Sequence, residues 1–237
     1  MSETAKTGLP LLQASQAQKH VTMNEALARI DALLQLTLAS RGVAHPPEAA
    51  TDGSVYAVPA GAVNAWEGQE GRLALRLNGG WVFLAPRAGW RAWVADEARA
   101  VHYTGETWAE TPAAASAGGA ATRFEVAEFD HEVIAGGAHE AGTVIPWGTQ
   151  VIGVTARILE PLTGSLSGWR LGVAGSDNRY GSGLSLAAGS WVRGLTGTPV
   201  SYYSDTPVLL TPEGGAFAGG RLRMAIHLVR LDVPALG

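Results

Sequence analysis

The segment Arg221-Leu-Arg-Met-Ala-Ile-His-Leu-Val-Arg-Leu231 decides the fold class of this 237-residue chain. Its apolar side chains recur at every second position through Leu222, Met224, Ile226 and Leu228, with mostly polar residues between them. That period is typical of a β-strand that buries one face and exposes the other. The segment therefore predicts a half-buried strand.

Short β-prone runs fill the rest of residues 123–237, and Gly, Pro, Asn or Asp separates them at intervals near the roughly 8–12 residues typical of sandwiches. No helix alternates with these runs, which disfavours the parallel sheets of nucleotide-binding folds. We therefore predict a C-terminal antiparallel β-sandwich of jelly-roll type. The runs are Arg123–Phe129, Thr143–Pro146, Gln150–Ile158, Gly168–Ala174, Ser190–Gly194, Pro199–Tyr203, Pro207–Leu210 and Arg221–Leu231.

Residues 42–110 predict a small Trp-rich β domain. Arg72–Leu77 alternates with a period of two, and Asn78-Gly79-Gly80 then joins it to Trp81–Leu84, which indicates a hairpin because Asn and Gly tolerate positive φ. The tryptophans of this region form either the core of a small domain or a flat platform for sugars. They are Trp66, Trp81, Trp90, Trp93 and Trp108.

Residues 1–41 contain the one convincing helix, which we expect over residues 23–38. Thr22 and Glu25 have the spacing of a capping box, and Gly42 follows the run as a C-cap. Its apolar surface is wider than one stripe, so something must bury it. Either it packs on its own domain, or it forms a seam between copies of the chain through Leu27, Ile30, Leu34 and Leu38.

The stretch at residues 111–122, TPAAASAGGAAT, has nothing to bury and predicts a flexible linker. The expected organisation is thus mainly β: a short N-terminal helical segment (1–41) for attachment or oligomerisation, the Trp-rich domain (42–110), the linker (111–122) and the sandwich (123–237).

Composition excludes several classes of protein. The 17 basic and 21 acidic residues give a net charge of −4 with no basic face, so nucleic acid is not an expected partner. The chain has no cysteine, which excludes disulfides and thiolate metal sites. No apolar stretch is long enough for a membrane helix, and the start lacks the apolar core of a signal peptide. We expect synthesis in the bacterial cytoplasm without membrane insertion.

Catalytic signatures are absent, and we expect neither enzymatic activity nor a cofactor. There is no Walker A loop, no Gly-x-Gly-x-x-Gly, no zinc helix and no nucleophile elbow; Gly164–Gly168 has leucine where the nucleophile would stand. His131-Glu132 and His139-Glu140 could in principle hold a metal, but a Gly-rich stretch separates them, so no metal site is predicted. Paired carboxylates for glycosidic cleavage remain possible, because their separation is not encoded in the sequence. The candidates resemble ordinary surface residues; they are Asp96, Glu97, Glu128, Asp130 and Asp205.

Two groups of residues are candidates for sugar binding. Val101-His-Tyr-Thr-Gly-Glu-Thr-Trp108 resembles the closing motif of small chitin- and cellulose-binding modules, which singles out Tyr103 and Trp108. The second group combines polar side chains with aromatic rings, as sugar sites on sandwich loops do, although a simple turn is the alternative. It consists of Asp177, Asn178, Arg179, Tyr180, Tyr202 and Tyr203.

The first half of the chain resembles a phage-associated family. The resemblance begins with Leu9-Pro-Leu-Leu-Gln-Ala-Ser-Gln-Ala-Gln-Lys-His-Val-Thr-Met-Asn-Glu-Ala-Leu27 and covers roughly residues 8–110. It continues through Gly53–Val58, Asn64–Gly68, Gly80–Pro86 and Gly89-Trp90. The family is a domain of unknown function found in alphaproteobacterial prophages and gene transfer agents. The resemblance implies a tail-fibre or head-spike protein in a virus-like particle, often a trimer, and implies no catalytic residues.

We therefore expect a fibre or spike protein that resides in a phage-like particle, associates with other particle proteins and binds a bacterial surface polysaccharide, either capsule or lipopolysaccharide. Several weak sites on one particle would add through effective concentration. Two alternatives remain open: a purely structural connector between capsid or tail and another fibre, and a depolymerase that cuts the polysaccharide. The sequence does not identify the glycan, and it does not distinguish a head spike from a tail fibre. It also does not show which domain carries the binding site or whether calcium is involved.

Overall fold

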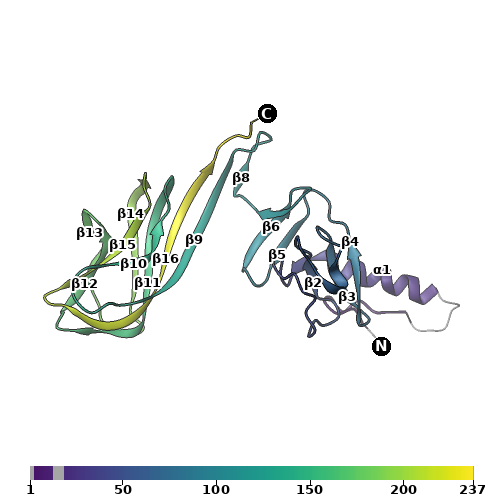
Figure 1. Cartoon of the computed structure of the whole chain (residues 1–237), viewed down its shortest axis with the longest axis horizontal. Helices are drawn as coiled ribbons and strands as arrows, with labels where there is room; N and C mark the ends of the chain where they lie inside the picture. Colours follow the sequence, from purple (N-terminus) through teal and green to yellow (C-terminus); the bar gives the residue numbers. More distant parts are fainter. Residues whose placement is uncertain (1–2, 13–18, 237) are drawn as a thin grey trace. The chain divides into compact units, whose positions relative to one another are not determined.

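Strands dominate the chain, as predicted, and they are grouped in two compact units at residues 1–111 and 112–237 (Figure 1). The structure, a computed structural model, describes residues 3–12 and 19–236. In that part of the chain, no helix combines the length and the hydropathy that crossing a membrane requires.

The first unit combines one helix with two small sheets. One sheet has the order β1-β5-β6-β7, in which β1 runs parallel to β5, and the other is the antiparallel sheet β2-β3-β4. The elements are α1 (Lys19–Leu34), β1 (Thr37–Leu38), β2 (Val55–Ala57), the 3-10 helix η1 (Asn64–Trp66), β3 (Leu73–Leu77), β4 (Gly80–Leu84), β5 (Arg91–Val94), β6 (Arg99–Tyr103) and β7 (Trp108–Glu110).

The predicted hairpin between β3 and β4 is confirmed. Leu77 pairs with Gly80, so Asn78 and Gly79 form a two-residue turn, and both have positive φ, at 50° and 74°. The Asp52 carboxylate accepts hydrogen bonds from both of their backbone N–H groups, at 3.0 and 3.3 Å.

The helix differs from the prediction at both ends. It already includes Lys19, so Thr22 lies inside α1 rather than at its N-cap. It ends at Leu34, and the chain then extends so that Leu38 pairs with Val94 in β5. Leu38 is fully buried in the core of the first unit, and its assignment to an oligomer seam is therefore wrong.

Two predicted domain boundaries also need correction. Ala32, Leu36 and Leu38 pack in one hydrophobic cluster with residues of β2, β3 and β5 to β7, so residues 1–41 are not a separate segment. The stretch 111–122 is not simply a linker, because Ala114–Ala115 forms strand β8 and Ala121 already begins β9. The first compact unit therefore ends at Thr111, and the second begins at Pro112, just before the hairpin of β8 and β9.

The second unit has the strand pairing of a jelly roll. β9 pairs with β16, β10 with β15, β11 with β14, and β12 with β13, so the chain forms nested antiparallel pairs. The two sheets have the orders β10-β15-β12-β13 and β14-β11-β16-β9-β8. Their strands are β8 (Ala114–Ala115), β9 (Ala121–Glu132), β10 (His139–Ile145), β11 (Thr149–Gly164), β12 (Gly168–Val173), β13 (Ser176–Leu184), β14 (Trp191–Tyr202), β15 (Thr206–Glu213) and β16 (Phe217–Asp232).

The alternation that predicted strand β16 is reproduced in its burial. Leu222, Met224, Ile226 and Leu228 all lie in the core of the second unit, together with residues of the facing sheet such as Leu171 and Leu210. The intervening side chains, among them Arg223 and His227, lie on the outer face of the five-stranded sheet. The predicted antiparallel β-sandwich is thereby confirmed, and its outer face carries most of the polar chemistry considered below.

Candidate functional sites

A cleft of about 610 Å³ opens on the first unit beside the predicted pair Tyr103 and Trp108. Strands β6 and β7 supply these two residues, and Arg41, Glu97 and other side chains complete the lining. The remaining lining residues are Gly42, Ala57, Val58, Pro59, Ala60, Glu70, Gly71, Glu106 and Thr107.

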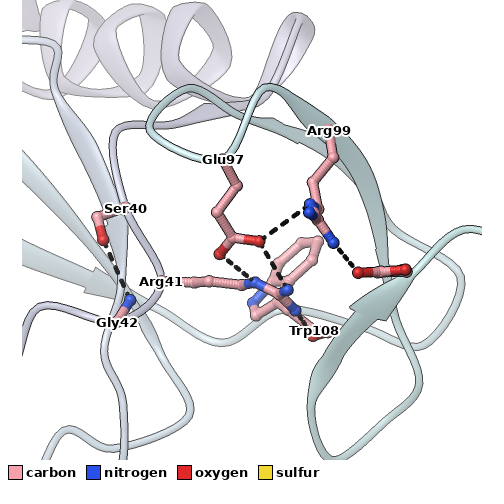
Figure 2. Close-up of polar contacts among 7 residues, drawn as sticks. Ser40, Arg41, Gly42, Glu97, Arg99 and Trp108 are labelled. Carbon is pink, nitrogen blue, oxygen red and sulfur yellow. Dashed lines mark hydrogen bonds and ion pairs between the residues drawn. The ribbon is translucent and has the colours of Figure 1, made fainter. Parts of the chain in front are cut away.

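Charged residues around this cleft form a chain of ion pairs (Figure 2). Arg41 donates to both oxygens of Glu97, at 2.7 and 2.8 Å, and its remaining nitrogen donates to the backbone oxygen of Trp108. Glu97 also lies 3.4 Å from Arg99, which in turn pairs with Glu110. The hydrogen bond from Arg41 holds the pKa of the Glu97 carboxyl below its ordinary value. The network thus fixes the segment around Arg41 against β7.

The two aromatic residues of this cleft are core residues. Their rings lie 5.3 Å apart in a tilted arrangement, and both side chains are buried in the cluster that also holds Leu38 and Val94. Stacking on a sugar needs an open ring face. Tyr103 and Trp108 do not offer one in this conformation, so the structure does not support them as a sugar platform.

The aromatic residues of the Trp-rich region behave similarly. Trp66 is fully buried and forms a cluster with Tyr56 and Trp81, with ring centroids 5.1 to 5.9 Å apart. Trp93, at 48%, is the most exposed of the five tryptophans of this region. This arrangement corresponds to the first of the two interpretations, the core of a small domain.

The predicted residues of the second unit are divided between core and surface. Tyr180 on β13 and Tyr202 at the end of β14 are buried, and their hydroxyls share a 2.7 Å hydrogen bond. Burial and that hydrogen bond raise the pKa of Tyr180. Because both rings fill the core, their assignment as sugar-stacking residues is wrong. A pattern of polar residues around a tyrosine does not reveal on which side of the sheet the ring lies.

The other four predicted residues retain some access to solvent. Asp177 is partly buried and forms an ion pair with Arg170 at 2.8 Å. Asn178 and Arg179 are exposed on β13, and Tyr203 is 83% exposed in the turn after β14. In the described parts of the chain, no hydrogen bond, ion pair or ring contact joins Tyr203 to Asn178 or Arg179, so these residues do not form one site.

The two histidine-glutamate pairs meet through their imidazole rings. His131 at the end of β9 and His139 at the start of β10 have Nε2 atoms 3.1 Å apart, and His131 is buried. Within residues 3–12 and 19–236, no group of three or more His, Cys, Asp or Glu side chains is arranged to hold a metal ion. The pair therefore joins two strands of opposite sheets by a side-chain hydrogen bond.

A groove of about 640 Å³ crosses the outer face of the five-stranded sheet, over β14, β11, β16 and β9. Its prominent side chains are Trp191 and Arg193 on β14, Arg157 on β11, Arg223 on β16 and Glu128 on β9. Trp191 is 61% exposed, and the Arg193 guanidinium lies 5.3 Å from the centre of its ring.

Sequence reasoning missed this groove, although one signal was present. In Trp191-Val-Arg-Gly-Leu195 the small or aliphatic Val192 and Gly194 face the core, which places Trp191, Arg193 and Leu195 on the outer face. A tryptophan in a β-prone run suggests core, and only the register of the neighbouring strands assigns it to the surface. Trp147, 68% exposed in the turn between β10 and β11, was also missed.

Comparison with known proteins supports part of the family resemblance. Residues 23–109 match a family described as "Protein of unknown function (DUF2793)", which is less than half of the chain. The resemblance of roughly residues 8–110 to a domain of unknown function is thereby confirmed over these positions. None of the curated proteins compared with the chain matches it.

Two solved phage structures contain chains that are similar to this one. The first, "Cyanophage Pam1 capsid asymmetric unit", is 21% identical with a TM-score of 0.36, over 52% of this chain and 94% of that chain. The second, "Acidic stable capsid structure of Helicobacter pylori bacteriophage KHP30", is 15% identical with a TM-score of 0.33, over 48% of this chain and 98% of that chain. At these scores neither likeness assigns a fold or a function to the chain.

Proposed function

We propose that this chain is a structural protein of a phage-like particle, a tail fibre or head spike of a phage or gene transfer agent, and that it binds a host surface polysaccharide. The match of residues 23–109 supports the first part, because this region lies inside the block that resembles proteins of prophages and gene transfer agents. In the particle the chain associates with other particle proteins and with copies of itself.

The observation that carries the binding role is a set of exposed aromatic side chains on the jelly roll. Trp147, Trp191 and Tyr203 are each more than half exposed, although aromatic rings of this size normally lie at least partly buried. Flat rings present apolar area at low entropic cost and combine it with a polar group, which suits them to the faces of sugar rings. Repeated copies on one particle would raise the avidity of a weak site.

Binding without cleavage is part of the proposal. A glycosidase acid needs a carboxyl group whose pKa is raised. In this chain the hydrogen bond from Arg41 lowers the pKa of Glu97, and the hydrogen bond from Arg223 lowers that of Asp130. Release of reducing ends during incubation with purified capsule would contradict this part and favour a depolymerase.

Self-association is proposed to use the exposed face of α1. Met23, Leu27, Ile30 and Leu34 follow one another at spacings of four, three and four residues, which is the spacing of a coiled-coil seam. Ile30 and Leu34 are 51% and 60% exposed, because the helix packs on its own unit through Ala32 on the opposite side. A trimer built on this stripe, here called the helix stripe, fits the resemblance to fibre proteins.

The decisive experiment measures binding of the labelled full-length protein to encapsulated bacteria and to an isogenic strain without capsule. We expect binding to the encapsulated strain alone, and heat-unfolded protein serves as the control for adhesion through exposed apolar surface. Lipopolysaccharide-deficient cells test the second receptor in the same way.

Failure to bind any of these cells, with the protein shown to be folded and oligomeric, would contradict the receptor-binding role. The chain would then be better described as a structural connector between capsid or tail and another fibre. In that case the exposed apolar residues of α1 and of the jelly roll would contact other particle proteins.

A further inference from the structure

The groove on the outer face of the jelly roll has a floor of short side chains between two rims of long ones. Thr155 on β11 lies between Arg193 on β14 and Ala225 on β16, and Ala225 pairs with Glu128 on β9. Adjacent to this row, Arg157 lies between Trp191 and Arg223. Neighbouring residues of one face lie about 5 Å apart across paired strands, so short side chains at the centre leave a hollow that the longer ones border.

The groove carries positive charge in a chain whose net charge is −4. Three arginines line it against one carboxylate, that of Glu128. Arg223 is engaged by Asp130, at 2.6 and 3.0 Å, and more loosely by Glu128 at 3.8 Å.

The other two guanidiniums have no carboxylate partner within the part of the chain that the structure describes. Arg157 donates to the backbone oxygen of Gly189 at 3.1 Å, and Arg193 lies over the Trp191 ring. Both retain free N–H donors, because a guanidinium has five. Planar guanidinium groups bind carboxylates through paired hydrogen bonds, which gives both strength and orientation.

Trp191 adds an apolar surface beside these donors. Arg193 lies over one face of its ring, and Trp191 is 61% exposed. The groove therefore offers a ring for stacking and two guanidiniums for an anion, all on β14 and β11.

We propose that this groove binds a carboxylated sugar unit of an acidic polysaccharide, with Trp191 against the sugar ring and Arg157 and Arg193 on its carboxylate. The inference rests on the proposed polysaccharide-binding role and adds to it the charge of the receptor and the location of the site. Thr155, whose hydroxyl lies 3.1 Å from His227 Nε2, contributes a polar group to the floor.

The test titrates the full-length protein with trigalacturonate and with galactotriose, its neutral counterpart, and follows binding by NMR at low and moderate salt. We expect binding of trigalacturonate, at least about tenfold weaker binding of galactotriose, and a further loss when salt screens the exposed charges. Four variants locate the site: Trp191→Ala, Trp191→Phe, the double variant Arg157→Gln/Arg193→Gln, and Phe124→Ala as the matched control, because Phe124 is an exposed aromatic residue on β9 that does not line the groove.

Supporting results are about a tenfold loss of affinity in Trp191→Ala, recovery of affinity in Trp191→Phe, and unchanged affinity in Phe124→Ala. The double variant should lose the preference for the carboxylated sugar. Unchanged affinity in Trp191→Ala or in the double variant would contradict the assignment of the groove as the sugar-binding site. The proposed binding of the protein to encapsulated cells would not be affected by that result. Absence of trigalacturonate binding would also contradict this assignment. A change of oligomeric mass in Trp191→Ala would contradict it too, because it would identify the groove as a protein interface. Loss of cell binding by the wild type would instead count against the proposed function.

Discussion

At the scale of single residues, the buried Asp31 links the N-terminal segment to α1. Lys6 N and Thr7 N each donate to its carboxylate at 2.8 Å, and the Thr7 hydroxyl donates as well. Burial by itself would raise the pKa of Asp31, but the hydrogen bonds from Thr7 and Lys6 outweigh it and hold the pKa below 3.8. The carboxylate thus stabilises the first unit in its ionised form.

Replacing this carboxylate should destabilise the first unit. We expect Asp31→Ala to lower the free energy of unfolding by about 2–3 kcal/mol, because three donors lose their acceptor. The contribution of Asp31 is complete above pH 3.8 and is lost as the pH falls through the lower folded-state pKa. Urea unfolding of the wild type and of Asp31→Ala measures the loss, and Glu48→Ala at an exposed carboxylate serves as the control. Equal midpoints for wild type and Asp31→Ala would contradict the assignment.

A second residue-scale feature is the contact between His131 and His139. Ile134 N–H points to His139 Nε2 at 3.5 Å, so we assign this nitrogen as the acceptor and His131 Nε2 as the donor. Burial and the nearby His139 lower the pKa of His131 below 6.5. Glu132 and Glu140 follow the two histidines in sequence, and Arg221 lies opposite Glu132 on β16.

Stability of the second unit should therefore fall with acidity. Because the folded-state pKa of His131 is lower than the unfolded one, the unfolded chain binds more protons below about pH 6.5, and the free energy of unfolding decreases there. We expect His131→Gln to reduce this dependence between pH 7.5 and 5 in urea unfolding. His227→Gln, on the outer face, should keep it. An identical pH dependence in His131→Gln and the wild type would exclude this histidine as the cause.

At the scale of elements, the end of α1 shows how packing overrides a local pattern. Apolar residues continue at helical spacing to Leu38, but β5 offers open backbone groups on its edge: Trp93 N donates to Leu36 O at 3.0 Å, and Ala95 N donates to Leu38 O at 2.8 Å. Extending the chain from Leu36 satisfies these donors and buries Leu38 as well. Of the four residues predicted for the oligomer seam, Leu27, Ile30 and Leu34 therefore remain candidates, whereas Leu38 does not.

The helix stripe gives a prediction about assembly. We expect Ile30→Glu/Leu34→Glu to convert the wild-type oligomer to monomer in size-exclusion chromatography with light scattering, because four-residue-spaced glutamates would be buried at the seam. Arg29→Glu, which also adds negative charge to an exposed position of α1, should leave the mass unchanged. These substitutions are preferable to deleting residues 1–41, which would also remove Leu36 and Leu38 from the core. An unchanged mass in the double variant would rule out the stripe.

Close approach of β13 and β14 requires a glycine. A Cβ at Gly194 would lie 2.3 Å from the backbone oxygen of Tyr180 and 2.8 Å from its Cα, atoms that cannot move without shifting β13. We expect Gly194→Ala to lower the free energy of unfolding by about 1–3 kcal/mol, the typical cost of overpacking. Gly197→Ala, on the same strand with no atom within 4 Å of the added Cβ, is the control. Equal thermal stability of the two variants would contradict this packing.

At the scale of the whole molecule, the second unit has a complete core of its own. Its hydrophobic cluster draws on both sheets of the jelly roll, and all of its members, including the partly buried Ala127 and Phe129, belong to the second unit. We therefore expect the fragment 112–237 to fold alone, with a β-type circular dichroism spectrum and a single cooperative unfolding transition. A fragment without a cooperative transition would show that residues 1–111 are needed for its stability.

The sequence by itself determined those features that depend on neighbouring residues. The period of two in residues 221–231 predicted β16 and its buried face, and Asn78-Gly79 predicted the turn between β3 and β4, because alternation and positive φ are local properties of the chain. The succession of short β-prone runs was sufficient to predict a sandwich. The tertiary structure decided which strands pair and therefore which side chains meet.

Pairing of β9 with β16 and of β11 with β14 brings together residues up to about a hundred positions apart, and no local pattern encodes such contacts. Packing of the two sheets against each other buried Tyr180 and Tyr202, which the sequence had suggested for sugar binding. The pairing of β11 with β14 gathered Trp191, Arg157 and Arg193 on one exposed face. A strand pattern specifies two faces, but only the packing of the sheets decides which face meets the core and which meets solvent.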